Sequence, residues 1–329
     1  MLKVVRLFED GTFQHEEKMI KELDLAIDLQ VRPSLTEAEV IENAKDADVI
    51  ITVYEPLTEN VLKQLPNLKI VLFRSIGFNT IDLEYANQIN LPVSHISRYC
   101  TDEVANYVIA AILMHNRRLH DFNQAVKQDY VWDYEMFPDM RRLSSLTVSL
   151  IGFGNIPRLI VERLKSFGPK VIAYDPFVTQ ETMAAYGVEK VSLEEAFQQG
   201  DYISSHLPLN AKTEKLLDEK LFNLTTKAPI FINSSRGGVV SEDALYHALT
   251  NGQLSYAILD VLTSEDPDLK NEKLLTLSNT ILTPHIAFYS QEAFIQGVED
   301  NFKNLANFLN GRYKEAEIVN ASAIEKKIS

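Results

Sequence analysis

Apolar runs of strand length alternate with amphipathic segments of helix length over most of the chain, which is the pattern of an α/β fold. Two of the helices after residue 147 have clear starts, because Ser192 and Glu195 form a capping box and Ser241 precedes two acids. Six apolar runs in this part are enough to complete a doubly wound parallel sheet, so it is predicted to be one domain. Its strands are expected at 147–152, 170–175, 201–206, 228–233, 255–260 and 279–285.

The first hundred residues show a second alternation of apolar runs and helical segments, with strands expected near 3–8, 48–53 and 69–73. A strongly apolar helix at 101–118 would link the two domains. Another helix pattern, at 292–311, follows the sixth strand of the larger sheet. Because the doubly wound sheet has no place left for this last helix, we expect it to pack on the first domain.

A length of 329 residues and a hydrophobic fraction of 46% allow two well-packed domains. One domain is expected to comprise residues 1–100 plus 287–329, and the other residues 101–286. The chain would then cross between the domains twice.

The charge of the chain excludes several classes of partner. A net charge of −14 and a pI near 5.0 would repel nucleic acid and anionic membranes, so neither is expected as a partner. Cys100 is the single cysteine, so no internal disulfide can form, and a reducing cytoplasm is the expected location. Neither a signal peptide nor a membrane span is expected, because the apolar runs are too short, and the seven histidines show no metal-ligand spacing.

The segment 147–175 has the order of elements that a dinucleotide site requires: an apolar strand, a glycine turn, a helix, a second strand and an acid. Gly152 and Gly154 allow a tight turn and the close approach of a pyrophosphate to the helix that begins near Asn155. Asp175 lies where a carboxylate can accept both ribose hydroxyls of NAD and repel the extra phosphate of NADP. The predicted cofactor is therefore NAD.

Pro157 stands where the third glycine of the motif is expected. Proline lacks an N–H and has a fixed φ, but the first helical turn tolerates both properties, because its N–H groups have no partner within the helix. The helix is therefore expected to form. What Pro157 puts in question is the close packing of the helix on the strand, which the third glycine normally permits.

Polar residues follow three of the apolar strands, at the sheet edge where ligands bind in open α/β folds. Arg236 lies in a glycine-containing turn, where a guanidinium could grip a carboxylate with two hydrogen bonds. Glu265 and His285 could pair, which would orient the imidazole and favour its protonated form for proton transfer. The residues alone equally allow Arg236 to form a surface salt bridge, Glu265 to be a solvated acid and His285 to be a core histidine. The three segments are 232–238, 259–267 and 282–290.

Five motifs in this order, over nearly the whole chain, resemble those of the D-2-hydroxyacid dehydrogenases. They are GFGNIP followed by YDP, HLPLNAKT, INSSRGGVV, LDVLTSEDP and TPHIAFYS. The resemblance implies two Rossmann-like domains, a doubly wound parallel sheet for the cofactor and a second, flavodoxin-like domain for the substrate. It also implies a homodimer and a small 2-oxo or 2-hydroxy acid as substrate.

The resemblance also implies a role for each site residue. Arg236, Glu265 and His285 would be catalytic, with Arg236 on the substrate carboxylate, His285 as acid and base, and Glu265 as its partner. The cofactor would contact Gly152, Gly154, Asn155, Ile156, Asp175, His206, Leu207, Pro208, Thr213, Ser234, Ser235, Arg236, Asp260 and His285. The substrate would contact Ile76, Gly77, Tyr99, Arg236, His285 and Phe288.

Two features keep alternatives open. Asp266 separates Glu265 from Pro267, where the family usually has the proline directly after the glutamate, so Asp266 is the second candidate for the partner of His285. The segments RSIGFNTID and HIAFYS resemble the D-lactate dehydrogenase branch, and RYCTDEVANY resembles the C-terminal binding proteins. The leading hypothesis is NAD-dependent reduction of a 2-oxo acid to the (R)-2-hydroxy acid. The alternatives are a phosphoglycerate dehydrogenase-like enzyme, in which Arg74 could bind phosphate, and an NADH-sensing binding protein.

Overall fold

The computed structural model describes residues 1–324, and it divides the chain into two compact units. The first unit contains residues 1–100 and the segment from Ser290 onward, and the second contains Thr101–Tyr289. The second crossover thus falls at 289/290, where the sequence pattern placed it at 286/287. Residues 325–329, which the sequence pattern assigned to the first domain, lie outside the described residues.

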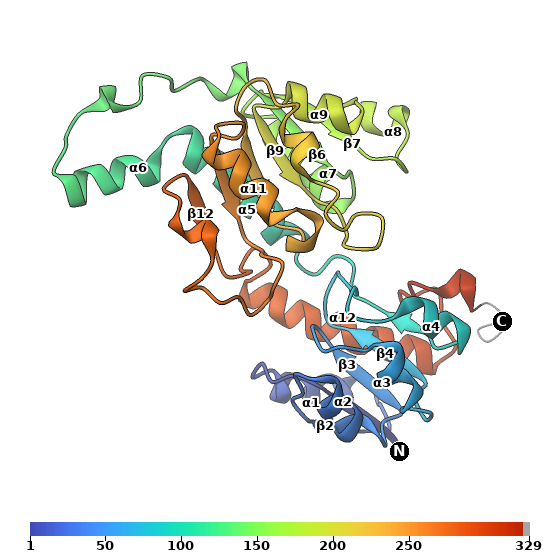
Figure 1. Cartoon of the computed structure of the whole chain (residues 1–329). Helices are drawn as coiled ribbons and strands as arrows, with labels where there is room; N and C mark the ends of the chain where they lie inside the picture. Colours follow the sequence, from blue (N-terminus) through green and yellow to red (C-terminus); the bar gives the residue numbers. More distant parts are fainter. Residues whose placement is uncertain (325–329) are drawn as a thin grey trace. The chain divides into compact units, whose positions relative to one another are not determined.

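The first unit is built on a five-stranded parallel sheet in the order β2-β1-β3-β4-β5, which is the flavodoxin-like order (Figure 1). The sequence pattern showed three of these strands. It missed β2, whose residues are mostly half-buried, and β5, which has only two residues. The strands are β1 (Leu2–Arg6), β2 (Ile27–Val31), β3 (Val49–Thr52), β4 (Ile70–Phe73) and β5 (Val93–Ser94).

Successive residues of these strands face opposite sides of the sheet and enter two separate cores. Along β4, Val71 and Phe73 lie in one apolar cluster, while Ile70 and Leu72 lie in the other. The C-terminal helix α12 (Gln291–Leu309) covers the second face, where Phe302 is fully buried beside β4. The remaining helices are α1 (Phe13–Glu22), α2 (Glu37–Ala44), α3 (Glu59–Lys63), α4 (Leu83–Gln88) and the 3₁₀ turn η6 (Ala321–Ala323).

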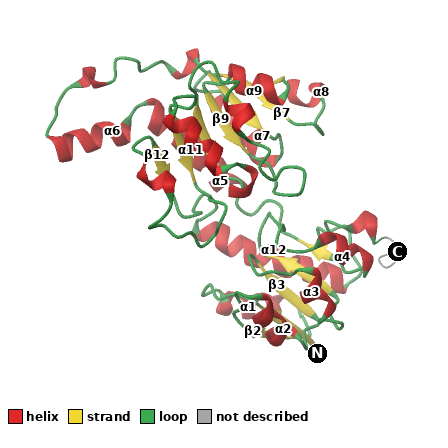
Figure 2. Ribbon diagram, viewed as in Figure 1, coloured by secondary structure: helices red, strands yellow, loops and turns green. Residues whose placement is uncertain are grey.

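The second unit is built on a seven-stranded parallel sheet in the order β12-β11-β10-β9-β6-β7-β8 (Figure 2). All six predicted strands are present. The seventh, β8 (Glu189–Lys190), was missed because two charged residues form no apolar run. The other strands are β6 (Thr147–Ile151), β7 (Lys170–Tyr174), β9 (Tyr202–Ser205), β10 (Ile230–Asn233), β11 (Tyr256–Leu259) and β12 (Thr280–Leu282).

Helices cover both faces of this sheet, as a doubly wound fold requires. Phe231 of β10 enters the cluster formed with α9, α10 and α11, and Ile232 enters the cluster formed with α5 and α7. The predicted caps are confirmed: Ser192 and Glu195 form a capping box, and Ser241 caps α11. The helices are α5 (Thr101–Asn116), α6 (Leu119–Gln124), α7 (Asn155–Leu164), α8 (Gln180–Ala184), α9 (Leu193–Gln199), α10 (Glu219–Phe222) and α11 (Glu242–Thr250). Short turns are η1 (Ala125–Asp129), η2 (Tyr134–Met136), η3 (Leu143–Ser145), η4 (Gly237–Val239) and η5 (Lys273–Thr276).

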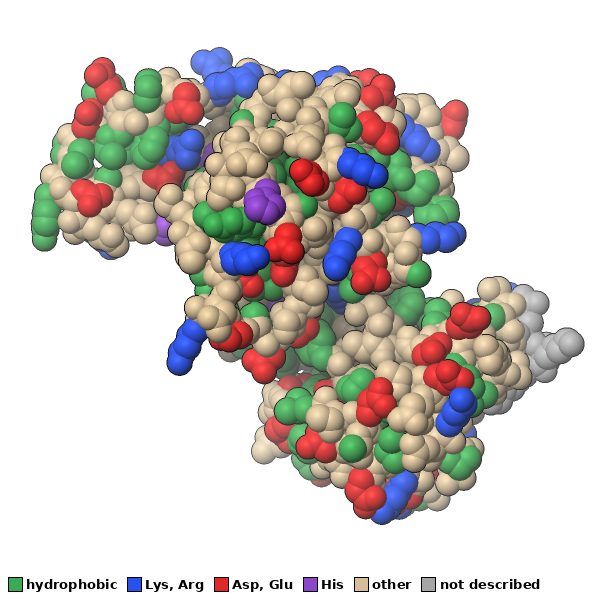
Figure 3. All heavy atoms as spheres, in the orientation of Figure 1, with side chains coloured by type: hydrophobic (Ala, Val, Ile, Leu, Met, Phe, Trp, Pro, Cys, Tyr) green, Lys and Arg blue, Asp and Glu red, His purple; other side chains and the backbone are tan. Residues whose placement is uncertain are grey.

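An arm formed by residues 118–142 extends away from the sheet of the second unit (Figure 1). Phe122 and Phe137 hold the outgoing and returning segments of the arm together, with ring centroids 5.0 Å apart. Its tip exposes three aromatic side chains, Tyr130, Trp132 and Tyr134, each by 84% or more. Apolar side chains also gather on this arm in the space-filling view (Figure 3).

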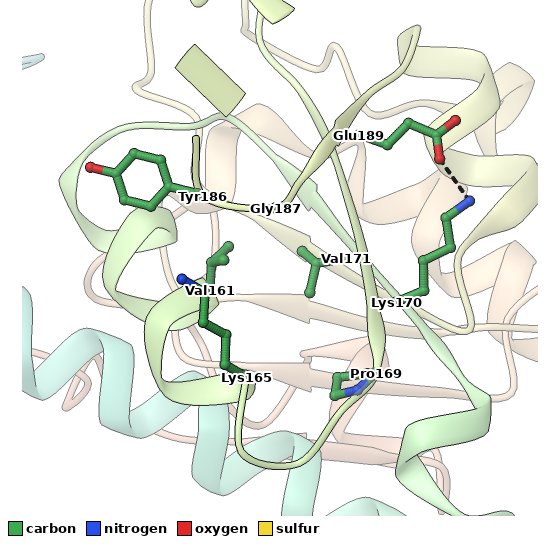
Figure 4. A pocket seen from close by; sticks show the side chains of 8 residues that line it. All are labelled: Val161, Lys165, Pro169, Lys170, Val171, Tyr186, Gly187 and Glu189. Carbon is green, nitrogen blue, oxygen red and sulfur yellow. Dashed lines mark ion pairs between the residues drawn. The ribbon is translucent and has the colours of Figure 1, made fainter. Parts of the chain in front are cut away.

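A pocket of about 240 Å³ lies between the C-terminal part of α7 and the first residues of β7 (Figure 4). Lys170 and Glu189 form an ion pair of 2.8 Å at its rim. None of the residues that line the pocket is among the predicted site residues.

Candidate active site

The glycine turn after β6 leaves backbone N–H groups open at the start of α7. Gly152 has φ +101°, and a Cβ there would lie 2.9 Å from the carbonyl oxygen of His206, so only glycine fits without strain. Gly154 is exposed, and a Cβ on it would meet no atom within 4 Å. No side chain caps α7, and its first turn contains no acid. These features fit a pyrophosphate on the N–H groups of Asn155 and Ile156.

Pro157 is the third residue of α7 and is buried. The helix begins at Asn155 as predicted, and the N–H of Arg158 donates to the Gly154 carbonyl oxygen at 3.3 Å. Because the N–H that proline lacks has no partner within the first turn, the substitution leaves the helix intact.

Asp175, directly after β7, uses one carboxylate oxygen to hold the glycine turn and the other to hold its own loop. Oδ2 accepts from the N–H of Phe153 at 2.9 Å, and Oδ1 accepts from the N–H of Phe177 at 2.8 Å. Each oxygen retains a second lone pair, so the carboxylate can still accept ribose hydroxyls. Sequence reasoning predicted the ribose contact but missed the bond to Phe153, which ties the acid directly to the glycine turn.

The loop after β9 carries the four residues predicted on the adenosine side: His206, Leu207, Pro208 and Thr213. The hydroxyl of Thr213 donates to the Pro208 carbonyl oxygen at 2.5 Å and accepts from the N–H of Asn210 at 2.9 Å, so it closes the loop on itself. Burial lowers the pKa of His206 to about 3, and its Nε2 bonds the Ser204 hydroxyl at 2.9 Å. His206 is therefore neutral at pH 7. Of its two neighbours, Leu207 is buried and Pro208 is exposed.

The turn after β10 is held by the buried Asn233. Its Oδ1 accepts from both the N–H and the hydroxyl of Ser235, and its Nδ2 donates to the Arg236 carbonyl oxygen at 3.0 Å. Gly237 packs directly on the next loop, because a Cβ there would lie 1.9 Å from the carbonyl carbon of Leu262. Ser234 has a buried hydroxyl without a hydrogen-bond partner among the described residues, which leaves it available to a ligand.

Asp260 directly follows β11 and is 1% exposed. Its Oδ1 accepts from the Thr283 hydroxyl at 2.6 Å and from the N–H of Ile286 at 2.8 Å, and its Oδ2 accepts from the N–H of Ala287 at 2.8 Å. Desolvation raises the pKa of the Asp260 carboxyl, and these hydrogen bonds oppose that rise. The hydroxyl of Tyr107 in α5 bonds that of Thr283 at 2.7 Å and extends the network.

The Asp260 network holds the backbone on which His285 is mounted. The N–H of His285 donates to the Asp260 carbonyl oxygen at 2.8 Å, and its φ of +52° is a left-handed conformation that needs such support. Sequence reasoning predicted Asp260 near the cofactor and missed this supporting role. A buried acid at the end of an apolar strand was the signal that could have indicated it.

His285 and Glu265 are brought together, with Nδ1 of the imidazole 2.7 Å from Oε2 of the carboxylate. Glu265, not Asp266, makes this contact, and the N–H of Asp266 instead donates to the Ser264 hydroxyl. The ring of Phe288 lies edge-on to the imidazole, with centroids 5.8 Å apart. Because Nδ1 faces the carboxylate, the other ring nitrogen, Nε2, is the one that can exchange a proton with a ligand.

The other predicted substrate residues, Ile76, Gly77 and Tyr99, belong to the first unit. Ile76 and Gly77 lie in the loop after β4, and Tyr99 precedes the first crossover. Arg74, at the start of that loop, is 7% exposed and forms ion pairs with the buried Glu16 and with Asp10.

Residues 109–287 match the sequence pattern of the D-isomer specific 2-hydroxyacid dehydrogenase, NAD binding domain. This range covers more than half of the chain and includes the glycine turn, Asp175, Arg236 and the His285–Glu265 pair. The chain belongs to this family. Family members are NAD-dependent oxidoreductases, and residues 109–287, which match the family's NAD-binding domain, all lie in the second unit.

The relatives of this chain are named for different acids. Glyoxylate reductase of Korarchaeum cryptofilum is 30% identical over 92% of this chain and 90% of its own length. D-3-phosphoglycerate dehydrogenase of Methanocaldococcus jannaschii is 33% identical over 84% of this chain, but the match spans only 52% of that protein. The structure of D-lactate dehydrogenase from Aquifex aeolicus with NAD and lactic acid is 30% identical, covers 96% of this chain and 98% of its own, and gives a TM-score of 0.85.

Within residues 1–324, no group of three or more His, Cys, Asp or Glu side chains is placed to hold a metal ion. No helix among the described residues has the length and apolar character needed to cross a membrane. On the face drawn in Figure 3, basic and acidic side chains are interspersed.

Proposed function

We propose that the chain is an NAD-dependent D-2-hydroxyacid dehydrogenase that interconverts a 2-oxo acid and its (R)-2-hydroxy acid. The observation that carries this proposal is the contact of 2.7 Å between His285 and Glu265, on a backbone held by the buried Asp260. An imidazole fixed on one side by a carboxylate can donate a proton to a developing alkoxide from the other side, and accept it in the reverse direction. Binding of NADH alone would not require this pair.

The proposed roles follow from the chemistry of each side chain. Bound NADH supplies the hydride that reduces the 2-oxo carbon. Arg236 grips the substrate carboxylate, because a guanidinium can donate two parallel hydrogen bonds to it. Protonated His285 neutralises the charge that develops on the 2-oxo oxygen, and Glu265 stabilises the imidazolium. We propose that the backbone of the substrate loop at Ile76 and Gly77 also binds the substrate carboxylate.

We propose a substrate whose side chain carries no charge. Phe78, Tyr99 and Phe288, in the segments that match the family's substrate and histidine loops, are aromatic and carry no positive charge to neutralise a second anion. Arg74, the cation considered for a phosphate, is already neutralised by Glu16 and Asp10. Burial of an unpaired phosphate or carboxylate costs several kcal/mol. This argues against phosphoglycerate, although D-3-phosphoglycerate dehydrogenases are among the relatives.

The experiment that tests the proposal is NADH oxidation with a panel of 2-oxo acids. Pyruvate and branched or aromatic 2-oxo acids should give higher kcat/KM than oxaloacetate and 3-phosphohydroxypyruvate. An NADH-sensing binding protein would bind NADH and oxidise it with none of these acids. A preference for the phosphorylated acid would instead support the phosphoglycerate alternative.

His285→Gln tests the proton-transfer role. We expect kcat to fall by about a hundredfold or more, because a positioned general acid contributes 10² to 10⁴. The affinity for NADH, measured by fluorescence titration, should stay near that of the parent enzyme. An unchanged kcat would contradict the assignment of His285. Glu265→Gln should also lower kcat, since the imidazole loses the carboxylate that orients it.

We also propose that the enzyme is a homodimer, supported by the exposed aromatic tip of the arm. Trp132 is the single tryptophan and is 90% exposed in one chain. If a second copy covers the arm, Trp132 fluorescence in the native protein should be that of a buried indole and should shift to the red on dilution. A monomer mass by light scattering, with a concentration-independent emission of an exposed indole, would contradict the homodimer.

A further inference from the structure

The loop Ser75–Phe78 of the first unit has three successive carbonyl groups bound to donors. The Ser75 carbonyl oxygen accepts from the N–H of Ile96 at 3.3 Å. The Ile76 carbonyl oxygen accepts from Nδ1 of His95 at 2.8 Å, and the Gly77 carbonyl oxygen accepts from the Ser75 hydroxyl at 2.6 Å. The loop is therefore held to the segment just after β5.

The C=O and N–H of a trans peptide point in opposite directions. Because residues 95–96 hold the carbonyls of Ser75 and Ile76, the N–H groups of Ile76 and Gly77 are directed away from those donors. Neither N–H donates to an acceptor within residues 1–324. Two neighbouring N–H groups without internal partners are suited to bind the oxygens of a carboxylate.

The bond from His95 also defines the form of its imidazole. A carbonyl oxygen can only accept, so Nδ1 must carry the hydrogen. The His95 backbone is fixed in turn, because Nδ2 of the buried Asn304 in α12 donates to its carbonyl oxygen at 2.8 Å. The Phe78 ring lies edge-on to the imidazole at a centroid distance of 5.4 Å. The imidazole is thus a rigid link between the loop and the body of the first unit.

We propose that His95 is a positioning residue for substrate binding: its Nδ1–H fixes the Ile76–Gly77 peptide so that the loop presents N–H groups to the substrate carboxylate. His95 acts through the loop and does not take part in proton transfer. This inference rests on the proposed function, because it assumes that the loop binds a 2-oxo acid.

Two variants of similar size separate the proposed role from a general effect on folding. In His95→Asn the amide nitrogen can take the place of Nδ1, whereas in His95→Gln the amide group reaches the place of Nε2. We expect H95N to keep KM for the 2-oxo acid within about twofold of the parent value. H95Q should raise KM about tenfold, the size expected for one lost hydrogen bond. In both variants kcat and the NADH affinity should change little.

Ser94→Ala is the matched control on the same segment. The hydroxyl of the buried Ser94 donates to the Ala316 carbonyl oxygen at 2.6 Å and makes no bond to the loop. We expect S94A to lower the melting temperature and to leave KM unchanged. Equal KM values for H95N and H95Q, or a KM for S94A raised as far as that for H95Q, would overturn the positioning role.

Two measurements do not depend on turnover. The ¹⁵N chemical shifts of the His95 ring should show the tautomer protonated at Nδ1, and the tautomer protonated at Nε2 would contradict the proposal. Oxamate, a carboxylate analogue that is not reduced, should bind the NADH complex of H95Q about tenfold more weakly than that of H95N. The parent enzyme could fail to oxidise NADH with every 2-oxo acid tested while these two results hold. In that case the proposed function is wrong and the loop geometry stands.

Discussion

Gly237 is the residue whose replacement should disturb the site most directly. A Cβ at this position would lie 1.9 Å from the carbonyl carbon and 2.0 Å from the carbonyl oxygen of Leu262. Ordinary contacts of a Cβ begin at 3.4 Å, so the Leu262–Thr263 peptide must retreat by about 1.5 Å in Gly237→Ala. No rotation of a side chain can relieve this contact, because the atoms that meet belong to the backbone.

The displaced peptide begins the loop that carries Glu265. The N–H of Thr263 donates to Oε1 of Glu242 at 2.6 Å, and Glu265 lies two residues further along. A shift of about 1.5 Å would lengthen the contact of 2.7 Å between Glu265 and His285 beyond the range of a hydrogen bond. We expect G237A to destabilise the enzyme by about 1 to 3 kcal/mol, as other overpacked interiors do. We also expect kcat to fall at least tenfold.

Gly238→Ala is the matched comparison. A Cβ there would lie 3.0 Å from Cδ2 of Leu209, and this half-buried side chain can move. Melting temperatures from circular dichroism and steady-state kinetics with NADH and a 2-oxo acid measure both effects. G238A should stay close to the parent enzyme. A G237A variant with the parent melting temperature and a kcat within twofold would refute the reasoning.

Three further predictions concern the second unit. Asp175→Ala should weaken NADH binding about tenfold, because the carboxylate proposed to accept the ribose hydroxyls also holds the N–H of Phe153. NADPH binding should weaken less, because the same carboxylate would repel the extra phosphate. Unchanged NADH affinity by fluorescence titration would argue against this double role. Asp260→Asn should lower both the melting temperature and kcat. The new NH₂ group would face an N–H or hydroxyl donor and leave that buried donor unpaired, which costs about 1 to 3 kcal/mol of stability. His115, whose pKa is lowered to about 4 mainly by burial, stays neutral in the folded protein while the unfolded chain takes up a proton below pH 6.5. The free energy of unfolding should therefore decrease as the pH is lowered below 6.5, and this group should account for about 2 kcal/mol of the decrease at pH 5. His115→Asn should remove that part of the pH dependence of unfolding, while replacement of the exposed His247 by Asn should not; equal pH slopes for both variants would contradict the assignment.

Much of the fold was predictable because apolar periodicity and caps are local signals. The six long strands of the second sheet and the capping box at Ser192 were found from the sequence. The strands β5 and β8 were not, because a strand of two residues depends on its neighbours in the sheet for stability and shows no periodicity of its own. The exchange of the third glycine for Pro157 could be judged from helix geometry alone, and the helix does form.

The candidate site was predictable where a residue type limits the chemistry. Arg236, Glu265 and His285 could be named, but the sequence left Asp266 open as an alternative partner, and only the course of the loop in space selects Glu265. The bonds that support the site were missed for the same reason. The contacts of Asp260 with the N–H groups of Ile286 and Ala287 join segments that are far apart in sequence.

The placement of α12 has a consequence for the order of folding. Val298, Phe302 and Leu305 of this helix complete an apolar cluster whose other members come from the first hundred residues. During synthesis, all of residues 101–289 leave the ribosome before that cluster can close. The entropy of closing a flexible loop rises with its length, so closure is easier once the intervening chain is compact. The second unit should therefore reach its native state first, and a chain truncated after residue 290 and released from the ribosome should show protease resistance in residues 101–289 but not in residues 1–100.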